Sequence, residues 1–157
     1  MSGVEIRTVS PIRVAFLRAK LKTFHDQKDS WGELMTFLMS NNLPPRGPTI
    51  SKYFSMEPID MAVCSPLNDD DVLPPHERIV VQVLEESQMA VYTHRGAMQD
   101  ISSAYEVLMP WLETSKYEQA GPSREVYVKV PFGEDIENGD WNNVVVEVHF
   151  PIKLKST

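Results

Sequence analysis

The sequence has one cysteine, few glycines and no long apolar run, and each shortage excludes a class of protein. Its cysteine, Cys64, cannot form an internal disulfide, which suits a reducing compartment, so we expect a cytoplasmic protein. No stretch approaches 18 apolar residues, which excludes a membrane-spanning helix, and the N-terminus lacks the basic-then-apolar layout of a signal peptide. Among seven glycines there is neither a phosphate-binding loop nor a Gly-x-Ser-x-Gly nucleophile elbow.

Basic residues are also scarce, with 15 Lys and Arg against 22 Asp and Glu and a formal charge of −7. Because phosphate neutralisation requires clustered cations, we expect no direct contact with nucleic acid. The four histidines show no i, i+4 pairing and no cysteine companions, so we expect no metal and no cofactor. We interpret His149 beside Glu147 as a surface pair rather than a catalytic dyad, and His94 as structural.

Apolar periodicity predicts two helices, over residues 26–41 and 98–114, among strands with alternating patterns. The predicted strands cover residues 4–7, 12–18, 49–55, 59–64, 78–85, 88–94, 121–130 and 143–152. Glu86-Ser87 is the predicted hairpin turn between two of these strands. We expect the acidic run 69–71 to be a solvated loop tip and residues 133–142 to form a polar loop.

The two halves of the chain share a register, which indicates a duplication. Trp31 in the first helix matches Tyr105 in the second, and Gly47-Pro48 matches Gly121-Pro122, both at an offset of 74. The sequence therefore predicts an α+β protein made of two strand-helix-strand-strand halves, with repeats at about 4–67 and 78–154 in one domain, 1–157. We expect pseudo-twofold packing of these halves around a central ligand cleft.

The strand that follows Gly121-Pro122 carries the main candidate functional residue, Glu125. Alternation along a strand predicts that Val126, Val128 and Val130 face a core, with Glu125 and Tyr127 on the other face. For one strand taken alone, a solvated face is the commoner case. If that face instead lines a cavity, the carboxylate becomes the functional centre.

Comparison of the two halves favours a cavity, and not a solvated surface, for the strand face that carries Glu125. Ser51 occupies the position equivalent to Glu125, so only one half carries the carboxylate. Trp31 and Tyr105 are equivalent aromatic residues that could face each other across a cleft. Met98 and Ile101 share a helical stripe with Tyr105, for which core packing is the simpler explanation.

These residues carry a resemblance to a known family. The duplicated layout, His94-Arg95-Gly96 before the second helix and the segment 121–127 resemble the GyrI-like small-molecule-binding domain. This effector-binding domain is also found fused to DNA-binding modules in multidrug-responsive bacterial transcription regulators. The resemblance covers residues 4–154 and implies halves of the SHS2 type. Since the chain shows no helix-turn-helix segment, a regulatory role would require a partner chain.

The resemblance also implies a site. In the family, a glutamate at the position of Glu125 lies at the base of an aromatic pocket and meets cationic, planar ligands. The implied ligand-binding residues are Glu125, Tyr127, Trp31, Tyr105, Ile101 and Met98, with Tyr53 and Val144 as weaker candidates. One departure concerns the wall of the pocket, because the usual Gly-Pro-Tyr is Gly96-Ala97-Met98 here.

Three functions follow from the resemblance. The first is a stand-alone binding protein for hydrophobic, often cationic, small molecules, anchored by Glu125. The second is a hydrolase of cyclopropane-bearing, DNA-alkylating compounds, in which Glu125 would be the general base and Tyr127 or Tyr105 the polarising hydroxyl. The third is a protein that binds and inhibits DNA gyrase. The sequence leaves the choice between binder and enzyme open.

Overall fold

The computed structural model describes residues 3–131 and 138–156, so part of the predicted polar loop 133–142 lies outside the described residues. The chain divides into two compact units. The first unit comprises residues 10–86, and the second unit comprises residues 1–9 together with 87–157. Each unit consists of an antiparallel sheet and one long helix, which confirms the predicted α+β class.

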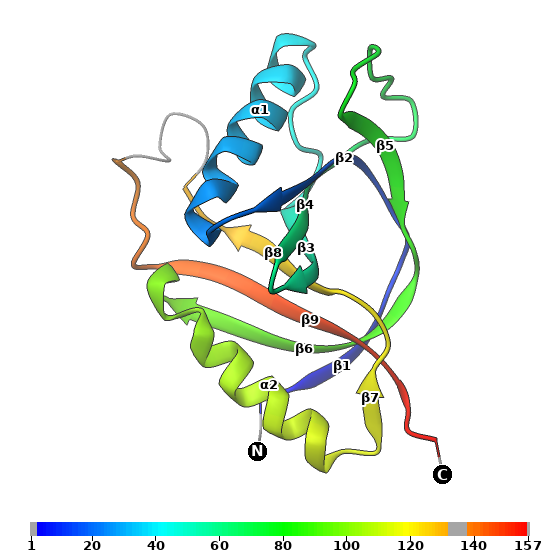
Figure 1. The fold of residues 1–157 in the computed structure, drawn as a ribbon, viewed down its shortest axis with the longest axis vertical. Helices are drawn as coiled ribbons and strands as arrows, with labels where there is room; N and C mark the ends of the chain where they lie inside the picture. The colour runs from blue at the N-terminus through cyan, green and yellow to red at the C-terminus, as the bar shows by residue number, and fades with distance from the viewer. Residues whose placement is uncertain (1–2, 132–137, 157) are drawn as a thin grey trace. The chain divides into compact units, whose positions relative to one another are not determined.

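The first unit is a four-stranded sheet with one helix (Figure 1). Its strands run in the order β3-β4-β2-β5. Leu34 and Leu38, one turn apart on α1, pack against Leu17 and Val63 of the sheet because the helical period places them on one face. The elements are β2 (Ile12–Leu21), the 3-10 turn η1 (Phe24–Asp26), α1 (Gln27–Ser40), β3 (Thr49–Met56), β4 (Ile59–Pro66) and β5 (Ile79–Leu84).

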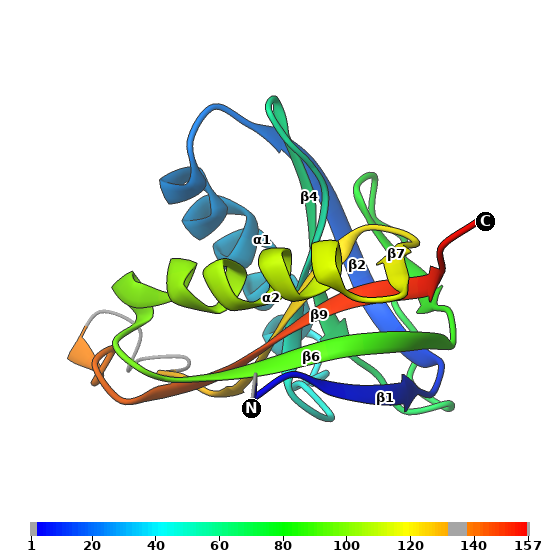
Figure 2. The ribbon, with the colours of Figure 1, turned by 90° about the horizontal axis from the view of Figure 1, so that it is seen from below.

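The second unit has the strand order β1-β6-β9-β8, and the short β7 pairs with the far end of β9. Helix α2 lies along β6 and β9 (Figure 2). Alternate residues of β9, including Val148, Phe150 and Ile152, form the core with Leu108 of the helix. The elements are β1 (Glu5–Val9), β6 (Ser87–Gly96), η2 (Met98–Asp100), α2 (Ser102–Thr114), β7 (Tyr117–Gln119), β8 (Ser123–Lys129) and β9 (Val144–Leu154).

The first strand of each repeat belongs to the sheet of the other repeat. Strand β1 precedes β2 in the chain but pairs with β6, and its equivalent β5 precedes β6 but pairs with β2. Strands β1 and β5 correspond at the same 74-residue offset, since Glu5 matches Ile79. The duplication was predictable from the sequence, but this exchange was not.

The predicted helices and strands are confirmed within a few residues of their ends. The predicted hairpin at Glu86-Ser87 is wrong, because β5 and β6 pair with different strands and lie in different units. Strand β7 was not predicted; its three residues are too few to show alternation. Among the described residues, no helix has the length and hydropathy needed to cross a membrane.

The predicted solvated tip at residues 69–71 is wrong for its last member. Asp71 is buried, because the Arg46 guanidinium donates two hydrogen bonds of 3.0 Å to its carboxylate. The backbone N–H of Asn68 donates a third, at 2.8 Å. These bonds hold the pKa of Asp71 below its ordinary value. The carboxylate therefore ties the loop that follows β4 to Arg46.

Candidate functional site

Glu125 lies on the face of β8 that α2 covers. Its cross-strand partner is Val148, a member of the core that packs against the helix. The residue is only 6% exposed, so the solvated interpretation of this strand is wrong. Ordinary strands place carboxylates in water, and a buried one requires polar partners.

Two tyrosine hydroxyls are partners of this carboxylate. Tyr105, in the first turn of α2, donates a hydrogen bond of 2.6 Å to Oε2 of Glu125. Tyr127, two residues along β8 on the same face, donates one of 2.8 Å to Oε1. The geometry thus joins three of the predicted residues in one cluster, which we call the tyrosine–glutamate cluster.

The surroundings of the tyrosine–glutamate cluster are apolar and aromatic. Tyr105 packs against the core of the second unit, and its ring centroid lies 5.9 Å from that of Phe150. Each phenol-to-carboxylate bond is charge-assisted, a class worth about 1.5–3 kcal/mol. The cluster therefore places a buried carboxylate beside aromatic rings.

The valine face of β8 departs from the prediction. Val128 is 48% exposed rather than part of the core. The pairing between β8 and β9 shifts between Tyr127 and Lys129, which is a bulge. The core under α2 lies on the Glu125 face of β8, so the opposite face, which carries Val126, is not the one that this helix covers. Alternation predicts that two faces exist but not which of them meets the core.

The other predicted residues of the second unit lie around the start of α2 and the start of β9. Gly96, at a φ of +131° that favours glycine, ends β6 and leads into η2. The N–H of Met98 donates to the Trp141 carbonyl oxygen at 2.8 Å, and Ile101 packs against the core. Val144 is fully buried. Ligand contact by Met98, Ile101 and Val144 stays a prediction.

Trp31 and Tyr53 belong to the first unit. Trp31 packs against that unit's core from α1. Tyr53 is buried, and its hydroxyl oxygen accepts a hydrogen bond of 3.0 Å from the Gln27 side-chain amide. Ligand contact by these two residues stays a prediction.

Phe24 is an aromatic residue outside the predicted ligand-binding set. It stands at the position equivalent to Met98 by the 74-residue offset. Half of its surface is exposed, and its ring lies edge-on to Tyr53 with centroids 6.2 Å apart. The alignment of the two repeats could have identified Phe24. The second repeat has Met98 where the family has an aromatic residue, and the first repeat has Phe24 at the equivalent position.

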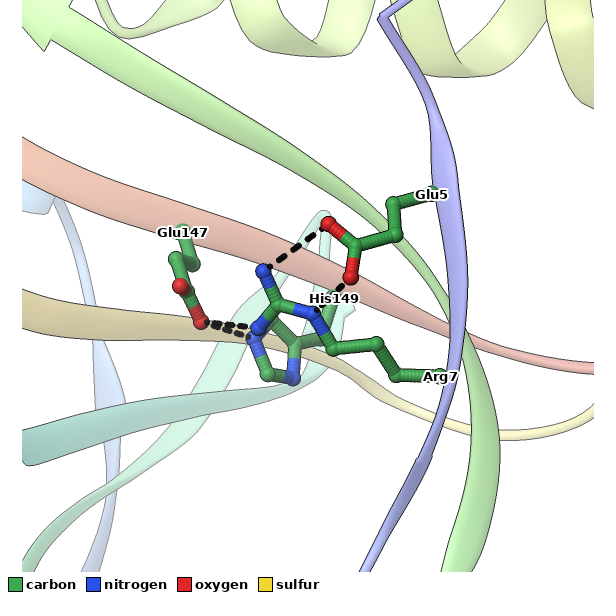
Figure 3. Close-up of polar contacts among 4 residues, drawn as sticks. All are labelled: Glu5, Arg7, Glu147 and His149. Carbon is green, nitrogen blue, oxygen red and sulfur yellow. Dashed lines mark hydrogen bonds and ion pairs between the residues drawn. The ribbon is translucent and has the colours of Figure 1, made fainter.

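A second polar cluster lies within the second unit (Figure 3). The His149 ring Nε2 and the Arg7 guanidinium both lie 2.9 Å from Oε1 of Glu147, and Arg7 also pairs with Glu5. The predicted contact between His149 and Glu147 is present, but the predicted surface location is wrong, because His149 is 4% exposed. We call these four residues the His149 cluster.

Burial and hydrogen bonds act in opposite directions on the pKa values of His149 and Glu147. Burial lowers the pKa of His149 below its ordinary value and outweighs the opposing hydrogen bond to Glu147. For Glu147, burial acts to raise the pKa, but the bonds from His149 and Arg7 prevail and leave it lowered. His149 is therefore a neutral donor to an ionised Glu147 near pH 7.

One hollow of about 540 Å³ lies beside the start of α2 and is separate from the predicted ligand residues. His94, which lines it, is buried and its Nε2 lies 2.7 Å from the Ala97 carbonyl oxygen, so His94 ties β6 to the turn before α2. Within residues 3–131 and 138–156, no group of three His, Cys, Asp or Glu side chains is arranged to hold a metal ion. The hollow is lined by Tyr92, His94, Arg95, Gly96, Ala97, Asp100, Ser102, Ser103 and Glu106.

Comparison with known proteins identifies relatives. A family model described as a GyrI-like small-molecule-binding domain matches residues 3–153. The C-terminal domain of EcmrR matches with a TM-score of 0.80 and 18% identity, over 97% of this chain and 98% of that one. In the EcmrR–DNA complex the match covers 57% of the EcmrR chain. No curated protein sequence matches this chain significantly.

Two further structures are similar at lower identity. SAV2435 bound to tetraphenylphosphonium matches with a TM-score of 0.56 and 11% identity, over 96% of this chain and 93% of that one. A hydrolase from Listeria innocua matches with a TM-score of 0.65 and 11% identity, over 97% and 92%. At these identities the likeness of structure shows a common fold.

Proposed function

The chain belongs to the GyrI-like small-molecule-binding domain family, and on this premise we propose that it binds hydrophobic, cationic small molecules with Glu125 as the charged anchor. The observation that carries the proposal is the tyrosine–glutamate cluster. A buried carboxylate held by Tyr105 and Tyr127 presents negative charge beside aromatic rings. Such a group favours a delocalised cation strongly over a neutral molecule of similar size.

Two features support this choice of ligand. SAV2435, which shares the fold, has a structure bound to tetraphenylphosphonium, an aromatic cation. The methionine at position 98 offers adaptable apolar surface, which suits ligands of varied shape.

The test compares a cationic ligand with a neutral one. Binding of tetraphenylphosphonium and of the neutral triphenylphosphine oxide is measured by calorimetry for the wild type and for Glu125→Gln. We expect Glu125→Gln to weaken binding of the cation about tenfold or more and to change binding of the neutral compound little. Equal loss for both compounds, or none for either, would show that Glu125 is not a charge anchor.

A hydrolase is the second candidate, because the same cluster has the parts of an acid–base site. A carboxylate within hydrogen-bond distance of two hydroxyls can take a proton from water while a phenol polarises the substrate. Mass spectrometry separates the two functions. A bound ligand recovered intact indicates a binder, whereas a cyclopropane-bearing alkylator recovered with one added water indicates a hydrolase.

A further inference from the structure

Strand β5 has an exposed, apolar edge. Within the described part of the chain it pairs with β2 alone (Figure 1). Val80, Val81 and Val83 are 42%, 39% and 47% exposed, and Gln82 between them is exposed as well. A strand edge with unpaired backbone groups and apolar side chains is a template for pairing with another strand.

The equivalent strand of the other repeat is protected. Among residues 3–131 and 138–156, strand β1 also pairs with one strand, β6, but it carries Glu5 and Arg7 where β5 carries Ile79 and Val81. Charged side chains are the usual protection of an edge strand. The two equivalent edge strands therefore differ, because β1 carries charged side chains at positions where β5 carries apolar ones.

We propose that β5 pairs with β5 of a second copy of this chain, antiparallel and about a two-fold axis, to form a homodimer. A two-fold axis that relates antiparallel edge strands stands perpendicular to the sheet and runs midway between the two strands. One residue of each strand must therefore pair with its own copy across the axis. The pairing is then fixed by which residue lies on the axis.

Charge selects Gln82 as that residue. With the axis at Gln82, Val81 faces the partner's Val83. Arg78 and Glu86 flank the two ends of β5, and the same register brings each Arg78 opposite the partner's Glu86. With the axis at Val81, Glu77 would face the partner's Glu85, and like charges opposite each other destabilise a sheet. With the axis at Val83, Val81 would face the partner's Glu85, which pairs an apolar side chain with a charge.

The axis at Gln82 also keeps existing contacts. Arg78 already pairs with Glu33 at 2.7 Å, and its guanidinium has further N–H groups for a second carboxylate. Val81 and Val83 lie on the same face of β5 as Ile79, which belongs to the core under α1, so the dimer would extend that apolar surface. Because one strand pair buries little area, we expect a weak dimer with micromolar to millimolar affinity.

The first experiment measures association. Sedimentation equilibrium of the full chain, from about 10 µM to 1 mM, is expected to show a monomer–dimer equilibrium. Val81→Lys should raise the dissociation constant about tenfold or more, because it places lysines at the shared edge. Val72→Lys is the matched control, since Val72 is a 78% exposed valine of the same unit that lies outside β5. A wild type that stays monomeric at the highest concentration overturns the proposal.

The second experiment tests the register. In a cross-strand pair the two Cα atoms lie about 4.5–5.5 Å apart, which a disulfide can bridge. Under mild oxidation Gln82→Cys should therefore form a covalent dimer, whereas Val80→Cys, which faces the partner's Leu84, should form little. The native Cys64 is buried and does not compete. Equal cross-linking at positions 80 and 82 would refute the register.

The third experiment exchanges the charges. Arg78→Glu and Glu86→Arg should each weaken the dimer, and the double variant should restore it, because the two charges then face each other in reverse. No restoration would show that Arg78 and the partner's Glu86 do not meet. The circular dichroism spectrum of each variant reports whether its fold is retained.

Discussion

At the scale of single residues, Glu125 is a carboxylate that strand β8 places in the protein core. The carboxylate is buried on the helix-covered face of β8, and two tyrosine hydroxyls donate to its two oxygens. The difference between the two halves pointed to Glu125, and the resemblance to the family implied Tyr105 and Tyr127 as further ligand-binding residues. This comparison favoured a cavity over a solvated face for Glu125, but the core was expected on the valine face, since alternation along one strand does not tell which face meets the core.

Tyr127→Phe should lower the free energy of unfolding by about 1–3 kcal/mol, because the variant removes one donor from a buried carboxylate. Urea denaturation measures the change. Tyr92→Phe is the matched control: Tyr92 is also half-buried, and its hydroxyl makes no hydrogen bond with any described residue. Equal losses in the two variants would mean that ring packing, and not the bond to Glu125, accounts for the effect.

His149 should make stability depend on pH. Its pKa is lowered in the folded protein, so the unfolded chain binds more protons as the pH falls below the ordinary value of 6.5. Stability should therefore decrease from pH 7 towards pH 5, by at most about 1.4 kcal/mol per pH unit for one proton. The lowered pKa of Glu147 adds a loss in the same direction below its ordinary value of 4.5.

His149→Gln should flatten this dependence, as measured by denaturation at several pH values between 5 and 7. Arg7, Arg124 and Glu147 are the charged groups that act on the ring, and they remain in the variant. His25→Gln is the control because His25 is exposed. A slope unchanged by His149→Gln would assign the pH dependence to other groups.

At the scale of elements, the sequence predicted which segments form strands but not which strands pair. Periodicity located β5 and β6 correctly, and the two residues between them suggested a hairpin. Pairing depends on contacts between distant segments, and a short connection that crosses between units looks like a turn in the sequence. The valines of β5 and the charged residues of β1 indicate whether each edge strand is protected only once the pairing shows that both are edge strands.

The loop after β4 offers a test at this scale. Asp71→Asn should lower the Tm by a few degrees, because the amide cannot accept both Arg46 bonds and the Asn68 N–H as an ionised carboxylate does. Thermal unfolding followed by circular dichroism measures the shift. Asp70→Asn, at the exposed neighbouring position, should change the Tm little, and an equal shift there would show that Asp71 has no special role.

At the scale of the whole molecule, the 74-residue offset predicted the duplication, and the family model over residues 3–153 confirms the resemblance on which the fold was predicted. The exchange of the first strands was beyond sequence reasoning. Repeats reveal which segments are equivalent, but equivalent segments can pair within their own repeat or with the other one.

Removal of residues 1–9 should affect one unit more than the other. The deletion takes β1 from β6 and removes Arg7 from Glu147, so amide hydrogen exchange in β6 and β9 should accelerate. Exchange in β2 and β4, which belong to the first unit, should change little. Hydrogen exchange with mass spectrometry measures both, and equal acceleration in all four strands would mean that the units unfold together.

The exchanged strands also restrict how such a chain could have arisen. A single repeat cut from this protein would have a sheet one strand short and a first strand with no sheet to join. Two such molecules could form a dimer by a reciprocal domain swap, in which the first strand of each molecule pairs with the sheet of the other. Fusion of the two repeats in one chain would make this strand exchange intramolecular, and therefore independent of protein concentration.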